Sequence, residues 1–236
     1  MLRRSLFGIA ALGLLLTAAP VLAQGGAYRS ANDNSQVRFR VGAFEPDGDG
    51  SYWDETFFDF TGSPGSFEDI VGGIEYIHWF GGHFGVIAAG SGYSSESVQA
   101  YRDFVDFDGF DITHTTKVSI ASGVVGLLFR LAGPNAAIQP YLGGGGGFFD
   151  WRLRETGDFI DFNDDLEIFN DSFAIDGTAF GTFFVAGLSV PVGEEWALFA
   201  EGRWDRADDE LEGDFQGLGD IDLSGRHLSF GAAWNF

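Results

Sequence analysis

The connections between strand-like segments alternate strictly between short and long along this sequence. Eight runs of roughly ten residues alternate in side-chain character and are rich in Val, Ile, Phe and Gly. They lie near residues 36–45, 67–80, 84–93, 114–131, 138–154, 177–191, 196–205 and 225–236. Three connections are short (81–83, 132–137 and 192–195) and four are long (46–66, 94–113, 155–176 and 206–224). In an antiparallel up-and-down sheet, all short turns then lie at one rim and all long loops at the other.

This asymmetry is typical of transmembrane β-barrels, which have an even number of strands, short periplasmic turns and longer external loops. Inside lipid, only a helix or a closed barrel can satisfy the polar groups of its own backbone, and no segment has the pattern of a convincing amphipathic helix. We therefore predict an all-β fold, an eight-stranded antiparallel up-and-down transmembrane β-barrel, over residues 36–236. A soluble periplasmic barrel is the alternative fold.

The N-terminal residues have the pattern of an export signal. A basic start with Arg3 and Arg4 precedes an apolar run, and Val21 and Ala23 supply the small residues that a signal peptidase requires. We predict a signal peptide over residues 1–23 and an N-terminal periplasmic segment over 24–35. The alternative, a membrane anchor, is disfavoured because the apolar run is shorter than the ~20 residues that a spanning helix needs.

Charge and composition exclude several classes of function. The chain has 35 Asp and Glu residues against 13 Lys and Arg, which argues against nucleic acid as a partner. It has no Cys, which excludes disulfides, thiolate metal sites and a cysteine nucleophile. Of the acidic residues, 26 fall in the long connections when these are taken as 46–66, 93–113, 155–176 and 205–224, so the sequence predicts acidic extracellular loops.

Charged residues also occur inside the strand runs, on the face opposite the apolar one. Charges within a narrow barrel must pair, because an isolated buried charge is too costly. A small barrel is filled by side chains, so we predict a charge network that plugs the lumen. Its predicted members are Arg38, Arg40, Glu75, Lys117, Asp150, Arg152, Arg154, Glu201 and Arg203. The alternative is a gated conduction path lined by Arg and Glu.

The last run separates its two faces most clearly. Leu228, Phe230, Ala232, Trp234 and Phe236 share one face, whereas the residues between them are small or polar. One face suits lipid and the other a polar interior. An ordinary edge strand that happens to end in Phe is the alternative interpretation.

The chain resembles the eight-stranded outer-membrane barrels of the OmpA-barrel, OmpX and OmpW type. The resemblance rests on residues 139–145, on 191–193 before 196–204, and on 228–236. It implies a monomer in the bacterial outer membrane that contacts membrane lipids and lipopolysaccharide. It also implies that Phe230, Trp234 and Phe236 form the signal read by the outer-membrane assembly machinery.

Such barrels serve different functions, so the resemblance specifies function poorly. We expect a noncatalytic protein with a structural or surface-interaction role and without a cofactor. A small OmpW-like channel for hydrophobic or small solutes is the alternative. A lipid-modifying enzyme is a minor one: His227 and Ser229 resemble the His-x-Ser pair of lipid A deacylases, but both are expected inside the barrel and no acidic residue follows them.

Acidic residues in the loops could hold Ca²⁺ or Mg²⁺ weakly, because both ions prefer oxygen ligands. The candidates are Asp47, Asp49, Asp164, Asp165 and Glu167. The first pair does not begin an EF-hand, because Tyr52 and Phe58 stand where that loop needs Gly and Glu. Acidic loops that are simply solvated are the alternative.

Two further features need a structural reason. Residues 143–147 are five consecutive glycines in a predicted strand, for which we expect strong curvature or room for Phe148 and interior Arg side chains. Phe residues also lie among the acids of the long connections, at 104, 107, 110, 159, 162, 169 and 173. We expect the strands to continue past the membrane there, and an exposed apolar patch is the alternative.

Overall fold

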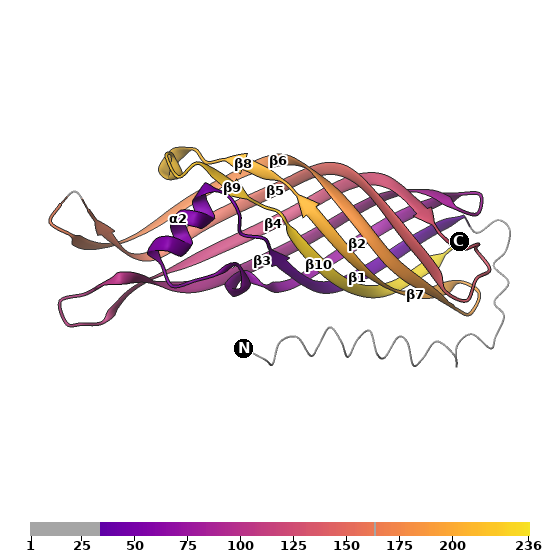
Figure 1. The fold of residues 1–236 in the computed structure, drawn as a ribbon, viewed down its shortest axis with the longest axis horizontal. Helices are drawn as coiled ribbons and strands as arrows, with labels where there is room; N and C mark the ends of the chain where they lie inside the picture. The colour runs from indigo at the N-terminus through magenta and orange to yellow at the C-terminus, as the bar shows by residue number, and fades with distance from the viewer. Residues whose placement is uncertain (1–33, 163) are drawn as a thin grey trace.

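The computed structural model describes residues 34–162 and 164–236, and it shows a closed antiparallel barrel of eight strands (Figure 1). The strands of the ring are β1 (Ser35–Pro46), β2 (Asp69–Phe80), β3 (Phe84–Val105), β4 (Asp111–Arg130), β5 (Gln139–Asp161), β6 (Glu167–Val192), β7 (Trp196–Arg206) and β10 (Gly225–Asn235). Each strand pairs with its neighbours in the ring, and β10 closes the barrel by pairing with β1 from Gln36 opposite Asn235 to Pro46 opposite Gly225. The predicted fold class is confirmed.

The two ends of the barrel differ as the loop lengths predict. Short turns join β2 to β3, β4 to β5 and β6 to β7 at one end, where the chain also finishes (Figure 1). The long connections gather at the other end. Those at 94–113 and 155–176 are mostly strand, because β3–β4 and β5–β6 extend as long hairpins. The expected extension of the strands is therefore confirmed.

The other two long connections fold over the open end of the barrel. The first contains helix α2 (Ser51–Asp59) and the 3-10 turn η1 (Pro64–Phe67). The second contains the short hairpin of β8 (Asp208–Glu210) and β9 (Asp220–Asp222), with the 3-10 turn η2 (Gly213–Phe215) between them. We call these two connections together the cap.

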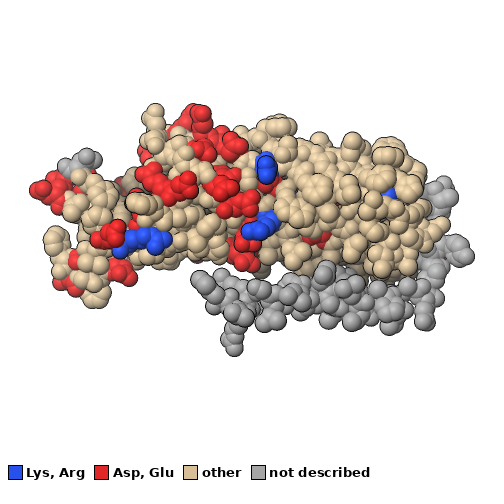
Figure 2. Space-filling view, viewed as in Figure 1, with Lys and Arg blue, Asp and Glu red and all other residues tan. Residues whose placement is uncertain are grey.

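On the face that Figure 2 shows, the half of the barrel nearer the short turns has almost no charged side chains at its surface. We call the outward apolar wall of this half the belt. Large apolar side chains stand outward on every strand of the ring, with 40–70% of their surface exposed in most cases. Members of the belt are Phe39, Ile74, Phe84, Val125, Leu127, Leu142, Phe148, Phe180, Phe184, Leu198, Trp204, Leu228 and Phe230. A wall of this kind suits hydrocarbon, and Trp196 and Trp204 near the two ends of β7 lie where aromatic girdles form.

Within the described residues, no helix has the length and apolarity that are needed to span a membrane. The predicted signal peptide, 1–23, lies outside the described residues, as does most of the segment 24–35. Strand β1 begins at Ser35, one residue before the predicted start of the barrel.

The five glycines of β5 allow the neighbouring strands to approach closely. A Cβ atom at Gly145 or Gly147 would overlap the carbonyl oxygen of Val125 or Gly123 on β4. A Cβ atom at Gly145 would also meet the ring of Phe183, which points inward from β6. The run therefore makes room for backbone and for Phe183, not for Phe148, which is 61% exposed on the outer face.

Candidate functional site

A four-member charge cluster lies in the centre of the lumen. Strand β1 contributes Arg38 and Arg40, and β2 and β7 contribute Glu75 and Glu201. The Arg40 Nε atom lies 3.4 Å from Glu75 Oε1, and the Arg40 Nη1 atom lies 3.8 Å from Glu201 Oε1. Arg38 Nη1 lies 3.8 Å and 3.9 Å from the same two carboxylates. All four side chains are buried, so each arginine lies between two carboxylates that water does not reach.

Aromatic and amide side chains complete this layer. The Tyr141 hydroxyl donates a hydrogen bond to Glu201 Oε2 at 2.8 Å, and the Arg38 guanidinium lies 4.6 Å from the centre of the Tyr141 ring. Toward the short turns, Arg38 Nε donates to Gln36 Oε1, and Gln36 Nε2 donates to Asn235 Oδ1 at 2.7 Å. The cluster is thus held by hydrogen bonds as well as by charge.

A second charged layer lies toward the cap. Arg203 Nε donates to Asp205 Oδ1 at 2.6 Å, and His227 Nε2 lies 2.8 Å from Asp205 Oδ2. The Arg203 guanidinium lies 4.8 Å from the centre of the Phe183 ring, and Phe44 packs on His227 at 4.6 Å. With Asp205 included, the two layers contain three arginines and three carboxylates. The opposing charges balance, as charges buried away from water require.

Four predicted members of the network lie elsewhere. Lys117, Asp150, Arg152 and Arg154 are exposed on the outer face, and this part of the prediction is wrong. The residues of β5 alternate between the two faces of the sheet as predicted. After Phe148, however, the outward face carries the charged side chains and the inward face the apolar ones. Beyond that residue the outer face meets water, and Phe149, Trp151 and Leu153 point into an apolar interior that the cap covers.

The cap places an aromatic cluster over the open end of the barrel. Tyr52 and Trp53 of α2 pack with Phe67 of η1 and Phe215 of η2 in one buried core. The Tyr52 hydroxyl donates to Glu155 Oε1 at 2.6 Å, and Trp53 Nε1 donates to the carbonyl of Asp222 at 2.9 Å. Burial raises the pKa of the Glu155 carboxyl above its ordinary value.

His114 lies in an aromatic cage inside the extended part of the barrel. Its ring centre is 4.3 Å from that of Phe60, 5.4 Å from that of Phe159 and 6.4 Å from that of Tyr101. Burial lowers the pKa of the imidazole to about 4, because no carboxylate compensates the cost of charging it there. The residue is therefore neutral at pH 7.

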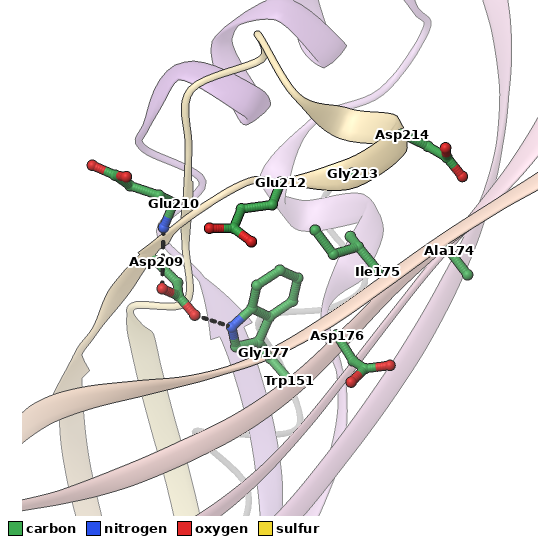
Figure 3. A pocket seen from close by; sticks show the side chains of 10 residues that line it. All are labelled: Trp151, Ala174, Ile175, Asp176, Gly177, Asp209, Glu210, Glu212, Gly213 and Asp214. Carbon is green, nitrogen blue, oxygen red and sulfur yellow. Dashed lines mark hydrogen bonds between the residues drawn. The ribbon is translucent and has the colours of Figure 1, made fainter.

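A pocket of about 600 Å³ opens between the cap and β6, where β6 extends past the end of β7 (Figure 3). Five carboxylates line it, from Asp176, Asp209, Glu210, Glu212 and Asp214. The Trp151 indole forms its inner wall and donates a hydrogen bond to Asp209 Oδ2 at 2.8 Å. Gly177 permits this contact, because a Cβ atom there would meet both partners. The pocket carries strong negative charge at the mouth of the barrel.

The cation candidates fall into two separate places. Asp47 and Asp49 lie beside β9, where the Asp49 amide donates to Asp222 Oδ2, whereas Asp164, Asp165 and Glu167 lie at the turn of the β5–β6 hairpin. Across the described chain, no three potential ligands of the His, Cys, Asp or Glu type converge as a metal would require. The proposed weak binding of Ca²⁺ or Mg²⁺ thus has no support from this geometry.

The hairpin turns also carry exposed Phe side chains. Phe107 and Phe110 on one turn and Phe162 on the other have well over half of their surface exposed. The hairpins lie side by side, since the Phe104 and Phe162 ring centres are 5.5 Å apart. An apolar patch thus exists beside the strand extension, so the two expectations for these residues both hold.

His227 and Ser229 are both buried and point into the lumen, as the sequence predicts. His227 has an acidic partner, Asp205, which is not among the predicted members of the network. The shared face of Glu201, Arg203 and Asp205 on β7 could have indicated it. Lipid cannot reach this group from the belt, so the arrangement does not fit an enzyme that acts on lipid.

The structure is similar to the outer membrane protein OprG from Pseudomonas aeruginosa, with a TM-score of 0.55 and 14% sequence identity over 86% of this chain and 96% of that one. The chain has the fold of the eight-stranded outer-membrane β-barrels. The outer-membrane location predicted from the sequence agrees with this fold and with the belt.

A second similar outer-membrane barrel is Neisserial surface protein A, with a TM-score of 0.46 and 13% identity over 86% of this chain and 96% of that one. No protein-family model and no curated protein matches the chain. Phe230, Trp234 and Phe236 of this outer-membrane barrel point outward at the end of β10, and their role as an assembly signal stays a prediction.

Proposed function

We propose that this chain is a noncatalytic outer-membrane barrel with a closed lumen, which presents its acidic cap and hairpins as a surface for interaction outside the cell. The balanced cluster of Arg38, Arg40, Glu75 and Glu201 is the observation that carries the proposal. An ion crossing the barrel would have to displace charges that satisfy one another in a place without solvent.

The cap supports the same conclusion. It places a second seal of packed aromatic rings above the charge cluster, and a cavity of only about 10 Å³ between Phe44, Phe149 and His227 separates them. That space is close to the size of a single water molecule. The carboxylates and exposed Phe rings stand outside this seal, where they are free to meet a partner.

Conductance in planar lipid bilayers tests the closed lumen against the alternative of a small channel. We expect the purified barrel to give no stepwise current at neutral pH. A variant with Arg40→Ala and Glu75→Ala serves as control, because it removes one arginine and one carboxylate from the same plug without changing net charge. Reproducible current steps from the unmodified protein would contradict the proposal and favour the channel.

A further inference from the structure

One edge of the extended sheet has no strand partner. Strand β6 pairs with β5 from its first residue, Glu167, which stands opposite Asp161. Its pairing with β7 begins only at Thr182, opposite Arg206, because β7 ends there. From Glu167 to Gly181, the side of β6 that faces away from β5 therefore has no neighbouring strand in the barrel. We call this side the free edge.

The cap covers one open edge of the extended sheet and leaves the other uncovered. At β3, the Thr61 amide of the cap donates to the carbonyl of Ala100 at 2.8 Å, and the Ala100 amide donates to Thr61 Oγ1 at 3.0 Å. At β6, among the described residues, no backbone hydrogen bond joins 168–181 to the cap, since β8 and β9 form a separate sheet. An uncovered strand edge presents N–H and C=O groups that can pair with another chain.

The pocket of about 600 Å³ lies along this free edge. Residues Ala174 to Gly177 of β6 form one side of it, and the cap from Asp209 to Asp214 forms the other (Figure 3). Its inner wall is apolar, because Trp151 belongs to the buried core and Ile175 packs against that core. The volume is within the range of ligand pockets. The cleft thus provides space for an extended chain beside β6.

The charge of the cleft selects a cationic occupant. Five carboxylates line it, and no described Lys, Arg or His does. Asp176 has only a weak exposed partner, Arg152 at 3.5 Å. The side chains of Glu210, Glu212 and Asp214 form no hydrogen bond or ion pair within the described chain. A second copy of this chain is unsuited to the cleft, because its own cap and β6 carry the same negative charge.

We propose that the free edge and the cap bind an extended peptide segment rich in Lys and Arg, which adds to β6 as a further strand. In strand addition, main-chain hydrogen bonds give affinity and alternate side chains give specificity. Successive side chains of the added strand point to opposite faces, so one set packs toward Trp151 and Ile175 while the other meets the carboxylates. This binding rests on the proposed function, because it names the partner of the acidic surface and the place where that partner binds.

Peptide binding to the whole protein in zwitterionic detergent tests the proposal. The probe is a short labelled peptide of alternating Lys and Val, and fluorescence anisotropy measures its binding. Methylation of all its amide nitrogens keeps the side chains and the charge but removes the main-chain donors. We expect the methylated peptide to bind about 30-fold more weakly, which corresponds to the loss of two hydrogen bonds. Amide exchange of residues 172–181 should slow when the unmethylated peptide binds.

A pair of variants with equal net charge tests the role of the cleft. The cleft variant is Glu210→Gln, Glu212→Gln, Asp214→Asn. The matched control is Asp103→Asn, Asp108→Asn, Asp111→Asn, at exposed positions of the β3–β4 hairpin. We expect the cleft variant to bind the peptide about tenfold more weakly, since each exposed ion pair contributes little and three are lost. The control should bind like the unmodified protein.

Three outcomes would overturn the proposal. Equal binding of the methylated peptide would show that no strand is added to β6. Equal weakening in the two variants would mean that only net charge matters. A dimer that protects residues 172–181 without peptide would show that a second copy occupies the edge. A conducting lumen, in contrast, would contradict the closed lumen of the proposed function and leave peptide binding unchanged.

Discussion

Replacement of Glu201 by Leu is expected to lower the free energy of unfolding by about 3 to 5 kcal/mol. The carboxylate lies beside two buried guanidinium groups, Arg38 and Arg40, and accepts a hydrogen bond from Tyr141. Its removal leaves two guanidinium groups with only one carboxylate, Glu75, in a place that water does not reach, which is the costly way to break a buried ion-pair cluster. Urea unfolding of the barrel in lipid vesicles, followed by tryptophan fluorescence, measures the change.

A double-mutant cycle separates lost pairing from lost packing. Arg38→Met combined with Glu201→Leu removes one charge of each sign, so the double variant should recover part of the stability that Glu201→Leu loses. Glu210→Leu, at an exposed position of the cap, is the matched control and should change stability by less than about 0.5 kcal/mol. If Glu201→Leu proved as mild as Glu210→Leu, the charge cluster would not hold the lumen closed.

Acidification from pH 7 to pH 4 is expected to destabilise the extended part of the barrel by about 2 to 3 kcal/mol through His114. Its pKa is about 4 in the folded protein and near 6.5 in an unfolded chain. The unfolded state therefore binds the proton first as the pH falls. The stability that the neutral ring provides is complete above pH 6.5, declines between 6.5 and 4, and levels off below 4.

The comparison with His114→Phe isolates this effect, because Phe keeps a ring in the aromatic cage and does not titrate. Glu155 works in the opposite direction: burial raises its pKa, so acid favours its folded form. Only the difference between the two proteins is therefore interpreted, from unfolding curves or from amide exchange of residues 99–116. The same pH dependence in both proteins would show that His114 is not the titrating group.

Much of the fold follows from the sequence because two independent patterns agree. Loop lengths place the short turns at one rim, and the alternation in β10 and β7 separates the lipid face from the lumen face. The core of the site follows too, since Arg38, Arg40, Glu75, Glu201 and Arg203 lie on faces opposite clearly apolar ones. The structure places all five inside.

The rest could not be predicted, because alternation does not tell which medium a face meets. Asp150, Arg152 and Arg154 alternate with Phe149, Trp151 and Leu153 just as lumen charges would alternate with lipid-facing residues. Only the position of the membrane boundary along the strand, which lies below Asp150, shows that these three charged side chains point outward into water. Helix α2 was missed for a related reason: its nine residues bury Tyr52 and Trp53 against β5 and β9, contacts that local sequence does not reveal.

The central claim is that an apolar belt faces lipid while the charge cluster is sealed inside, and fluorescence quenching at single cysteines tests it most directly. The chain has no Cys, so Phe148→Cys, Phe230→Cys and Arg152→Cys each introduce one labelling site. We expect probes at positions 148 and 230 to be quenched by brominated lipid chains and protected from iodide, and a probe at 152 to show the reverse. Iodide quenching at 148 and 230 that equals that at 152 would contradict the account.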